Sequence, residues 1–164
     1  MQRAYIGLGS NLQDPATQVE KAIAALAQIS NSRFVAASSL YRSTPLSGEG
    51  VPAGQPDYIN AVAAIDTQLS PLQLLYALQA IENQHDRQRD GVRWSARTLD
   101  LDLLLYGQEI ISSEQLTIPH AGLVDRNFVL YPLFEIAPDL LLPQHGPLVA
   151  VLANISKSGL QRLA

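Results

Sequence analysis

Four short apolar runs along the chain predict β-strands. Residues 4–8 are a short apolar run followed by glycine, which predicts a buried strand. Residues 33–42 alternate loosely between apolar and polar positions. Residues 58–67 and 98–107 are longer, rich in alanine or leucine, and bounded by polar segments. Short apolar runs between turn-forming residues are typical of strands in a packed sheet.

Two segments between these runs carry apolar residues at helical spacing. The first follows Asp14, a predicted N-cap, and Pro15, and its apolar positions are Val19, Ala22, Ile23, Leu26 and Ile29. The second follows Ser70 and Pro71, and its inward positions are Leu74, Leu75, Leu78 and Ile81. A capping residue before proline at the first turn marks a helix start, so each segment predicts a helix.

The order of these elements, β-α-β-β-α-β, predicts an α+β fold: a ferredoxin-like sandwich with a mainly antiparallel sheet. After it we expect a short extra strand, a helix over residues 128–136 interrupted at Pro132, and a last helix over 148–155. At 164 residues the chain has the size of one domain, so residues 1–164 are expected to form a single domain.

Two segments, residues 43–57 and 83–96, lack periodicity and predict long loops. The first is rich in glycine and proline, and the second is rich in charge. Loops of this length inside a compact domain are often functional.

Composition excludes several classes of protein. A net charge of −4 gives no general attraction for nucleic acid or an anionic membrane. The chain has no cysteine, which excludes a disulfide framework and thiolate metal sites. No apolar run approaches the length of a membrane span. We therefore expect a cytoplasmic protein, acting as a monomer, with no nucleic acid or membrane partner.

Two acids, Asp100 and Asp102, interrupt the last predicted strand. Residues two apart in a strand share a face, about 6.6 Å apart, while Leu99, Leu101 and Leu103 point to the other face. The acids are either solvated at an edge, which is the commoner case for an isolated pair, or they bind a divalent cation. Hard cations such as Mg²⁺ take carboxylate oxygens as ligands.

Clustered arginines favour the second alternative. Four of the eleven basic residues lie within eleven positions just before the acids: Arg87, Arg89, Arg93 and Arg97. Guanidinium groups bind phosphate through paired donors. Because "GLGSNL" has Leu12 where a dinucleotide-binding loop has its third glycine, and no P-loop sequence is present, carboxylates and arginines would have to bind the nucleotide.

The stretch "RWSARTLDLDLLLYG" closely resembles the signature of the 6-hydroxymethyl-7,8-dihydropterin pyrophosphokinases. The resemblance extends along nearly the whole chain, through "YIGLGSNL", "YRSTPL", "QPDYINA", "LLYALQAIE", "LTIPH" and "RNFVLYPLFEIAPDL". It implies a ferredoxin-like enzyme of folate biosynthesis that transfers pyrophosphate from ATP to 6-hydroxymethyl-7,8-dihydropterin, giving AMP, with loops that close over the substrates.

The same resemblance implies roles for individual residues. Asp100 and Asp102 would ligate two Mg²⁺ ions carried with ATP, and Arg87 and Arg97 would be catalytic. Contacts with ATP would come from Gln79, Glu82, Arg89, Arg93, Trp94, Leu103, Thr117, His120 and Arg126. Contacts with the pterin would come from Ser43, Leu46, Tyr58, Asn60 and Phe128.

Four of these roles have a simpler alternative. Tyr58 and Phe128 could be core aromatics, His120 a loop histidine, and Glu82 a solvated acid at a helix end. Three positions depart from the family pattern: Asp90, Gln115 and Ala121. His85 and His145 are expected to be structural or exposed, and Arg3, Arg33 and Arg42 to be solvated. The main rival function is a nucleotide sensor that binds ATP without turnover. An RNA-binding module would need a basic face and exposed aromatic residues in one strand, and the sequence shows neither.

Overall fold

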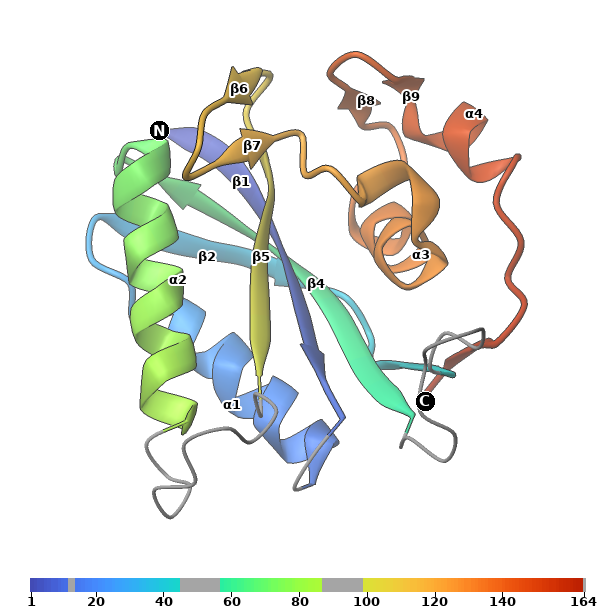
Figure 1. Ribbon diagram of the computed structural model, residues 1–164, viewed down its shortest axis with the longest axis horizontal. Helices are drawn as coiled ribbons and strands as arrows, with labels where there is room; N and C mark the ends of the chain where they lie inside the picture. Colours follow the sequence, from blue (N-terminus) through green and yellow to red (C-terminus); the bar gives the residue numbers. More distant parts are fainter. Residues whose placement is uncertain (12–13, 45–56, 87–98, 164) are drawn as a thin grey trace.

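The computed structural model describes residues 1–11, 14–44, 57–86 and 99–163, which form a mixed α/β structure around an antiparallel sheet (Figure 1). β1 (Gln2–Ser10) and β4 (Tyr58–Thr67) pair over their whole lengths at its centre. β5 (Asp100–Tyr106) lies at one edge beside β1. On the other side of β4 lie β2 (Ser32–Ala37) and β3 (Tyr41–Ser43), and β10 (Leu160–Arg162) pairs with β3.

Helices cover both faces of this sheet. α1 (Pro15–Leu26) and α2 (Pro71–Asp86) pack on one face, where alternate strand residues such as Ile6, Ile65 and Leu101 form a core with them. α3 (Asn127–Ile136) packs on the other face, over a second core that includes Val62 and Leu104. The period-2 pattern of the strands thus supplies both cores.

The predicted strand over residues 33–42 is wrong as a single element. The structure divides it into β2 and β3, which pair with different parts of β4. Ser38 lies at the break, where its Oγ accepts a hydrogen bond from the Val62 N–H at 3.0 Å. This side chain replaces a ladder hydrogen bond, so the chain changes course without leaving a buried donor unpaired.

The helix starts and ends differ in part from expectation. Ser70 caps α2 as predicted, since its Oγ accepts the Gln73 N–H and the Gln73 side chain accepts the Ser70 N–H. Asp14 makes no such cap for α1; its carboxylate instead accepts the Thr17 hydroxyl. α3 continues through Pro132, which is buried, and is not interrupted there. Proline removes only one backbone donor, and burial of Val129, Leu130 and Leu133 outweighs that loss.

The C-terminal part holds more strands than the one extra strand that was expected beside its two helices. β6 (Ile111–Ser112) pairs with β7 (Thr117–Ile118), and β8 (Leu141–Leu142) pairs with β9 (Gly146–Pro147). Between them the 3-10 helix η1 (Leu123–Asp125) leads into α3. α4 (Leu148–Leu152) is shorter than predicted, and the chain then returns to the main sheet as β10. Across the described segments, no helix is long and apolar enough to cross a membrane.

Asp66, near the end of β4, binds two arginines that were expected to be merely solvated. Arg3 Nε lies 2.6 Å from one carboxylate oxygen and Arg33 Nη2 lies 2.9 Å from the other. These hydrogen bonds lower the pKa of Asp66 from 3.8 to about 2. The three residues connect β1, β2 and β4 at the end of the sheet away from the acids of β5.

We expect Asp66 to make stability depend on pH in acid. Its folded-state pKa is depressed, so its contribution is present above the unfolded value near 4 and is lost as pH falls through about 2. Urea unfolding of wild type and Asp66→Asn should therefore differ most above pH 4 and converge near pH 2. A difference that stays constant between pH 5 and pH 2 would contradict the role of this carboxylate.

Candidate active site

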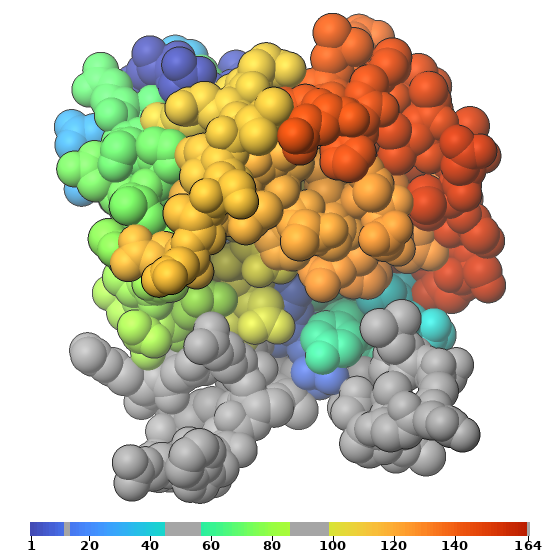
Figure 2. All heavy atoms as spheres, turned by 45° about the horizontal axis from the view of Figure 1, so that its top comes forward, coloured from blue at the N-terminus to red at the C-terminus, as the bar shows by residue number. Residues whose placement is uncertain are grey.

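A cavity of about 420 Å³ opens at one end of the sheet, on the face that α3 covers. Its described wall comes from β1, β3, β4 and β5 together with η1 and the start of α3. Figure 2 shows the ends of β1 (blue), β4 (green) and β5 (yellow) side by side at the surface below α3 (orange). This volume lies within the range of small-molecule sites.

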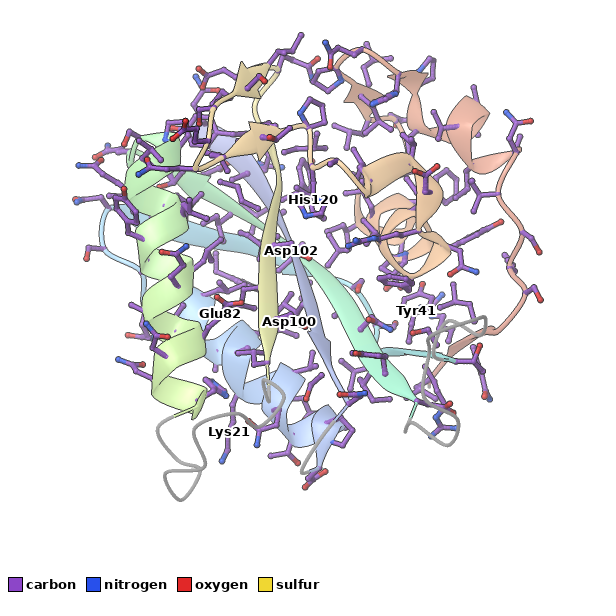
Figure 3. All side chains as sticks on the ribbon, in the orientation of Figure 1. Lys21, Tyr41, Glu82, Asp100, Asp102 and His120 are labelled. Atoms are coloured by element: carbon purple, nitrogen blue, oxygen red, sulfur yellow. The ribbon has the colours of Figure 1, made fainter. Side chains whose placement is uncertain are left out.

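Asp100 and Asp102 both line this cavity, as the alternation along the strand predicted. They follow one another along β5 (Figure 3), while Leu101 and Leu103 are buried in the core on the opposite face. Across the sheet they lie opposite Gly9 and Gly7 of β1, respectively. Because these glycines have no side chain, the surface beside the acids is open and a ligand can reach the carboxylates and the backbone.

Two hydrogen-bond donor side chains approach the second acid. The side chain of Asp102 is 44% exposed, with His120 Nε2 at 3.8 Å and Arg126 Nη1 at 3.9 Å. The Gly122 N–H donates to His120 Nδ1, which assigns the proton of the neutral ring to Nε2, on the side of Asp102. His120 is therefore part of the site and not only a loop histidine (Figure 3).

Glu82 supports β5 from the side of α2. Its side chain is buried, and Oε2 accepts the backbone N–H of Leu101 at 2.8 Å. Leu101 lies between the two acids on a strand at the edge of the sheet, where this donor has no neighbouring strand within the described residues. The alternative of a solvated helix-end acid is therefore wrong, because the carboxylate holds the strand that carries Asp100 and Asp102.

Glu82→Ala should lower the free energy of unfolding by roughly 1–3 kcal/mol, because it leaves the buried Leu101 N–H without its acceptor. Glu82→Gln keeps an acceptor oxygen and should lose much less. Urea unfolding of both variants and of wild type measures the difference. Equal losses in the two variants would show that the charge of Glu82, and not the hydrogen bond to Leu101, is what matters.

A buried amide lies at the opposite side of the cavity. Asn60 is 4% exposed, and its Nδ2 donates to Ser43 Oγ at 2.7 Å. A Cβ added to Gly9 would lie 3.2 Å from Asn60 Oδ1, so the amide packs directly against β1. Tyr58 lines the same cavity two residues earlier on β4. The amide is thus fixed in orientation by its surroundings.

Arg126 and Phe128 complete the described wall from the start of α3. The Arg126 guanidinium carbon lies 5.9 Å from the centre of the Phe128 ring. A Cβ on Gly122 would lie only 2.5 Å from Arg126 Nε, so glycine at this position leaves room for the guanidinium. Tyr58 and Phe128 are therefore not simply core aromatics, because both reach the cavity.

Other predicted positions lie elsewhere or outside the described residues. Leu103 is buried in the core below the sheet, whereas Gln79 on α2 and Thr117 on β7 are exposed away from the cavity wall. Gln115 and Ala121 are exposed, as is His145, and His85 is buried against Gln18. The predictions for Leu46, Arg87, Arg89, Asp90, Arg93, Trp94 and Arg97 fall outside the described segments.

Sequence reasoning missed seven residues of the cavity wall: Gly7, Leu8, Gly9, Thr44, Ala61, Asp125 and Val129. The two glycines were considered only as part of an incomplete dinucleotide-binding loop. The two glycines are two residues apart, as are Asp100 and Asp102 on the neighbouring strand. This shared spacing could have indicated that the glycines lie opposite the acids. Asp125 and Thr44 carried no local signal.

The carboxylates fit Mg²⁺ that arrives with a nucleotide. Within the described part of the chain, no three His, Cys, Asp or Glu side chains are grouped to hold a metal by themselves. Mg²⁺ is typically bound by one or two carboxylates together with substrate phosphates and water. Asp100 and Asp102, on one face and open to the cavity, match that donor set.

Comparison with known proteins decides the family. The model of 7,8-dihydro-6-hydroxymethylpterin-pyrophosphokinase (HPPK) matches residues 5–138. This chain belongs to the HPPK family. The match includes every described residue named above for the cavity, from Gly7 to Val129.

Relatives of similar length support the HPPK assignment. The 2-amino-4-hydroxy-6-hydroxymethyldihydropteridine pyrophosphokinase of Haemophilus influenzae is 57% identical over 140 residues, covering 85% of this chain and 84% of the relative. That of Pseudomonas aeruginosa is 48% identical over 163 residues, covering 99% and 98%.

Solved structures share the fold at low identity. A Plasmodium falciparum HPPK-DHPS A437G structure with SDX-DHP matches with a TM-score of 0.76 at 12% identity, covering 98% of this chain and 48% of that one. An HPPK-DHPS complex with substrates has a TM-score of 0.73 at 11% identity, covering 99% and 46%. The chain spans about half the length of these structures.

Proposed function

We propose that this HPPK chain transfers pyrophosphate from ATP to the hydroxymethyl group of 6-hydroxymethyl-7,8-dihydropterin, with two Mg²⁺ ions held by Asp100 and Asp102. The observation that carries the proposal is that one cavity joins two different ends. One end has a pair of carboxylates with His120 and Arg126, and the other has a buried amide with two aromatic rings. Membership of the family gives the reaction.

Each end of the cavity suits one substrate. A flat heteroaromatic ring needs stacking partners and an in-plane hydrogen-bonding group, which Phe128, Tyr58 and Asn60 supply. A polyphosphate needs cations and hydrogen-bond donors, and beside the acids Arg126 supplies a guanidinium and His120 an N–H donor. The pterin hydroxymethyl group would then point along the cavity towards the phosphates.

The residues of this chain act mainly by positioning and charge stabilisation, which is what phosphoryl-type transfer requires. Mg²⁺, when bound, would neutralise the phosphate oxygens and favour attack by the hydroxymethyl oxygen at the β-phosphorus with loss of AMP. Glu82 keeps β5 in place, and Asn60 orients the acceptor ring. Arg87 and Arg97, by resemblance to the family, would stabilise charge on the transferring group.

The finer description of the fold is also part of the proposal. The antiparallel order β3, β4, β1, β5 with two helices on one face supports a ferredoxin-like classification. Cytoplasmic location and a monomeric state belong to the same proposal, and light scattering of the purified protein would test the latter.

Pterin-dependent release of AMP from ATP tests the function. We expect AMP to form only when ATP, Mg²⁺ and hydroxymethyldihydropterin are all present, and to stop when the metal is chelated. A nucleotide sensor would bind ATP without making AMP, so binding by calorimetry with no AMP by chromatography would reject the enzyme in favour of that alternative.

A further inference from the structure

The end of the chain runs past the proposed pterin side of the cavity. Residues 156–162, named here the C-terminal strap, include β10, which pairs with β3 so that Leu160 lies opposite Ser43. The Thr44 N–H then donates to the Gly159 carbonyl at 3.0 Å. The strap is therefore bonded to the strand end that supplies Ser43 and Thr44 to the cavity wall.

The same strap is bonded to the start of α3 through Asn127. The Asn127 Nδ2 donates to the carbonyls of Ser156 and Ser158, at 3.0 Å each. Asn127 lies between Arg126 and Phe128 in sequence, and these two neighbours line the cavity whereas Asn127 does not. Its side chain thus faces the strap while its neighbours face the site.

The space between the strap and the site is hollow. A second cavity of about 460 Å³ lies there, and its wall shares Ser43, Thr44, Arg126 and Phe128 with the first cavity. Apolar packing cannot set the spacing of two elements across such a gap. The spacing on this side therefore depends on directional contacts, and the hydrogen bonds of Asn127 and Thr44 are the ones that lie beside the cavity.

Gly159 makes the tight approach of strap and strand possible. Its φ is +75°, a conformation that favours glycine, and an added Cβ would lie 2.6 Å from Thr44 Oγ1. A second attachment lies further along the strap, where Arg162 Nη2 is 3.6 Å from Glu135 of α3 and Tyr41 of β3 donates to the same carboxylate at 2.6 Å.

We propose that Asn127 is a positioning residue for the pterin subsite, acting through the C-terminal strap. By bonding α3 and β3 to one segment, it fixes the separation of Phe128 from Ser43 and thereby the width of the ring-binding part of the cavity. The strap lies beyond residues 5–138, which the family model matches. The inference rests on the proposed function, because it assigns the ring-binding end to the pterin.

Steady-state kinetics of Asn127→Ala test the proposal. Losing both donors should raise KM for hydroxymethyldihydropterin roughly tenfold and change KM for ATP less than about twofold. Gly159→Ala changes the strap and leaves α3 unaltered, so it should also raise KM for hydroxymethyldihydropterin. Gln108→Ala is the matched control, since Gln108 Nε2 likewise donates to a backbone carbonyl, that of Leu141, but Gln108 lines neither cavity, so both constants should stay unchanged.

Amide hydrogen exchange separates positioning from a general loss of stability. In ligand-free Asn127→Ala, the Thr44 N–H should exchange faster while amides in the middle of β1 stay protected. Unchanged pterin KM in an active enzyme, or an equal rise in both KM values, would overturn the proposal. Absence of pterin-dependent AMP from wild type would instead remove the proposed function, and direct titration with pterin would then show whether this end binds the ring at all.

Discussion

Asp102→Ala is expected to lower pterin-dependent AMP formation about a thousandfold or more, equivalent to roughly 4 kcal/mol of lost transition-state stabilisation. Asp102 is open to the cavity, and no backbone group among its described contacts depends on it. Its loss should therefore leave the fold intact while removing one of the two carboxylates that we propose hold Mg²⁺. A coupled assay of AMP measures the loss of activity, and the melting temperature shows whether the fold is intact.

Asp139→Ala provides the matched control for charge. Asp139 is exposed beyond the end of α3 and away from the cavity wall, so the same substitution should leave turnover near that of wild type. Turnover of Asp102→Ala within about threefold of wild type would exclude the proposed metal-ligand role, whatever the control shows.

Asn60→Ala should reduce kcat/KM for the pterin about a hundredfold while leaving the KM for ATP nearly unchanged. The amide is buried and held by Ser43 and by the close approach of Gly9, so a ligand meets it in one fixed orientation. A preorganised group of this kind discriminates strongly, because a ring that cannot pair with it leaves the amide unsatisfied. Initial rates with each substrate varied in turn separate the two constants.

Ser43→Ala separates two contributions of Asn60: its contact with the pterin and the orientation in which Ser43 holds its amide. It removes the acceptor that holds Asn60 Nδ2 and keeps the amide itself, so its effect should be clearly smaller than that of Asn60→Ala. If Asn60→Ala raised the KM for ATP as much as that for the pterin, the assignment of the two ends of the cavity would be wrong.

The local sequence pattern was sufficient to predict the placement of the two acids and most of the helices and strands. Alternation along β5 correctly placed Asp100 and Asp102 on one face with Leu101 in the core, and both acids reach one cavity. Ser70 correctly marked the start of α2. These predictions depend only on neighbours within a few residues, where periodicity and capping chemistry act.

Contacts between distant residues could not be predicted in this way. The break between β2 and β3 depends on Ser38 bonding to Val62, and the pairing of Asp66 with Arg3 depends on the register of β1 and β4. The return of the chain as β10 to pair with β3 has no local signal in residues 160–162. Sheet register and long-range pairing arise from the packed fold as a whole.

The two glycines opposite the acids differ in how much substitution they tolerate. A methyl group on Gly7 would make only ordinary contact with the Leu104 side chain, at 3.4 Å or more, whereas one on Gly9 would press on the Asn60 amide at 3.2 Å. Substitutions that add a side chain to the β1 wall of the cavity, such as those selected for resistance to a bulky inhibitor, should therefore arise at Gly7. At Gly9 the same change would disturb the Asn60 amide, which we propose recognises the pterin.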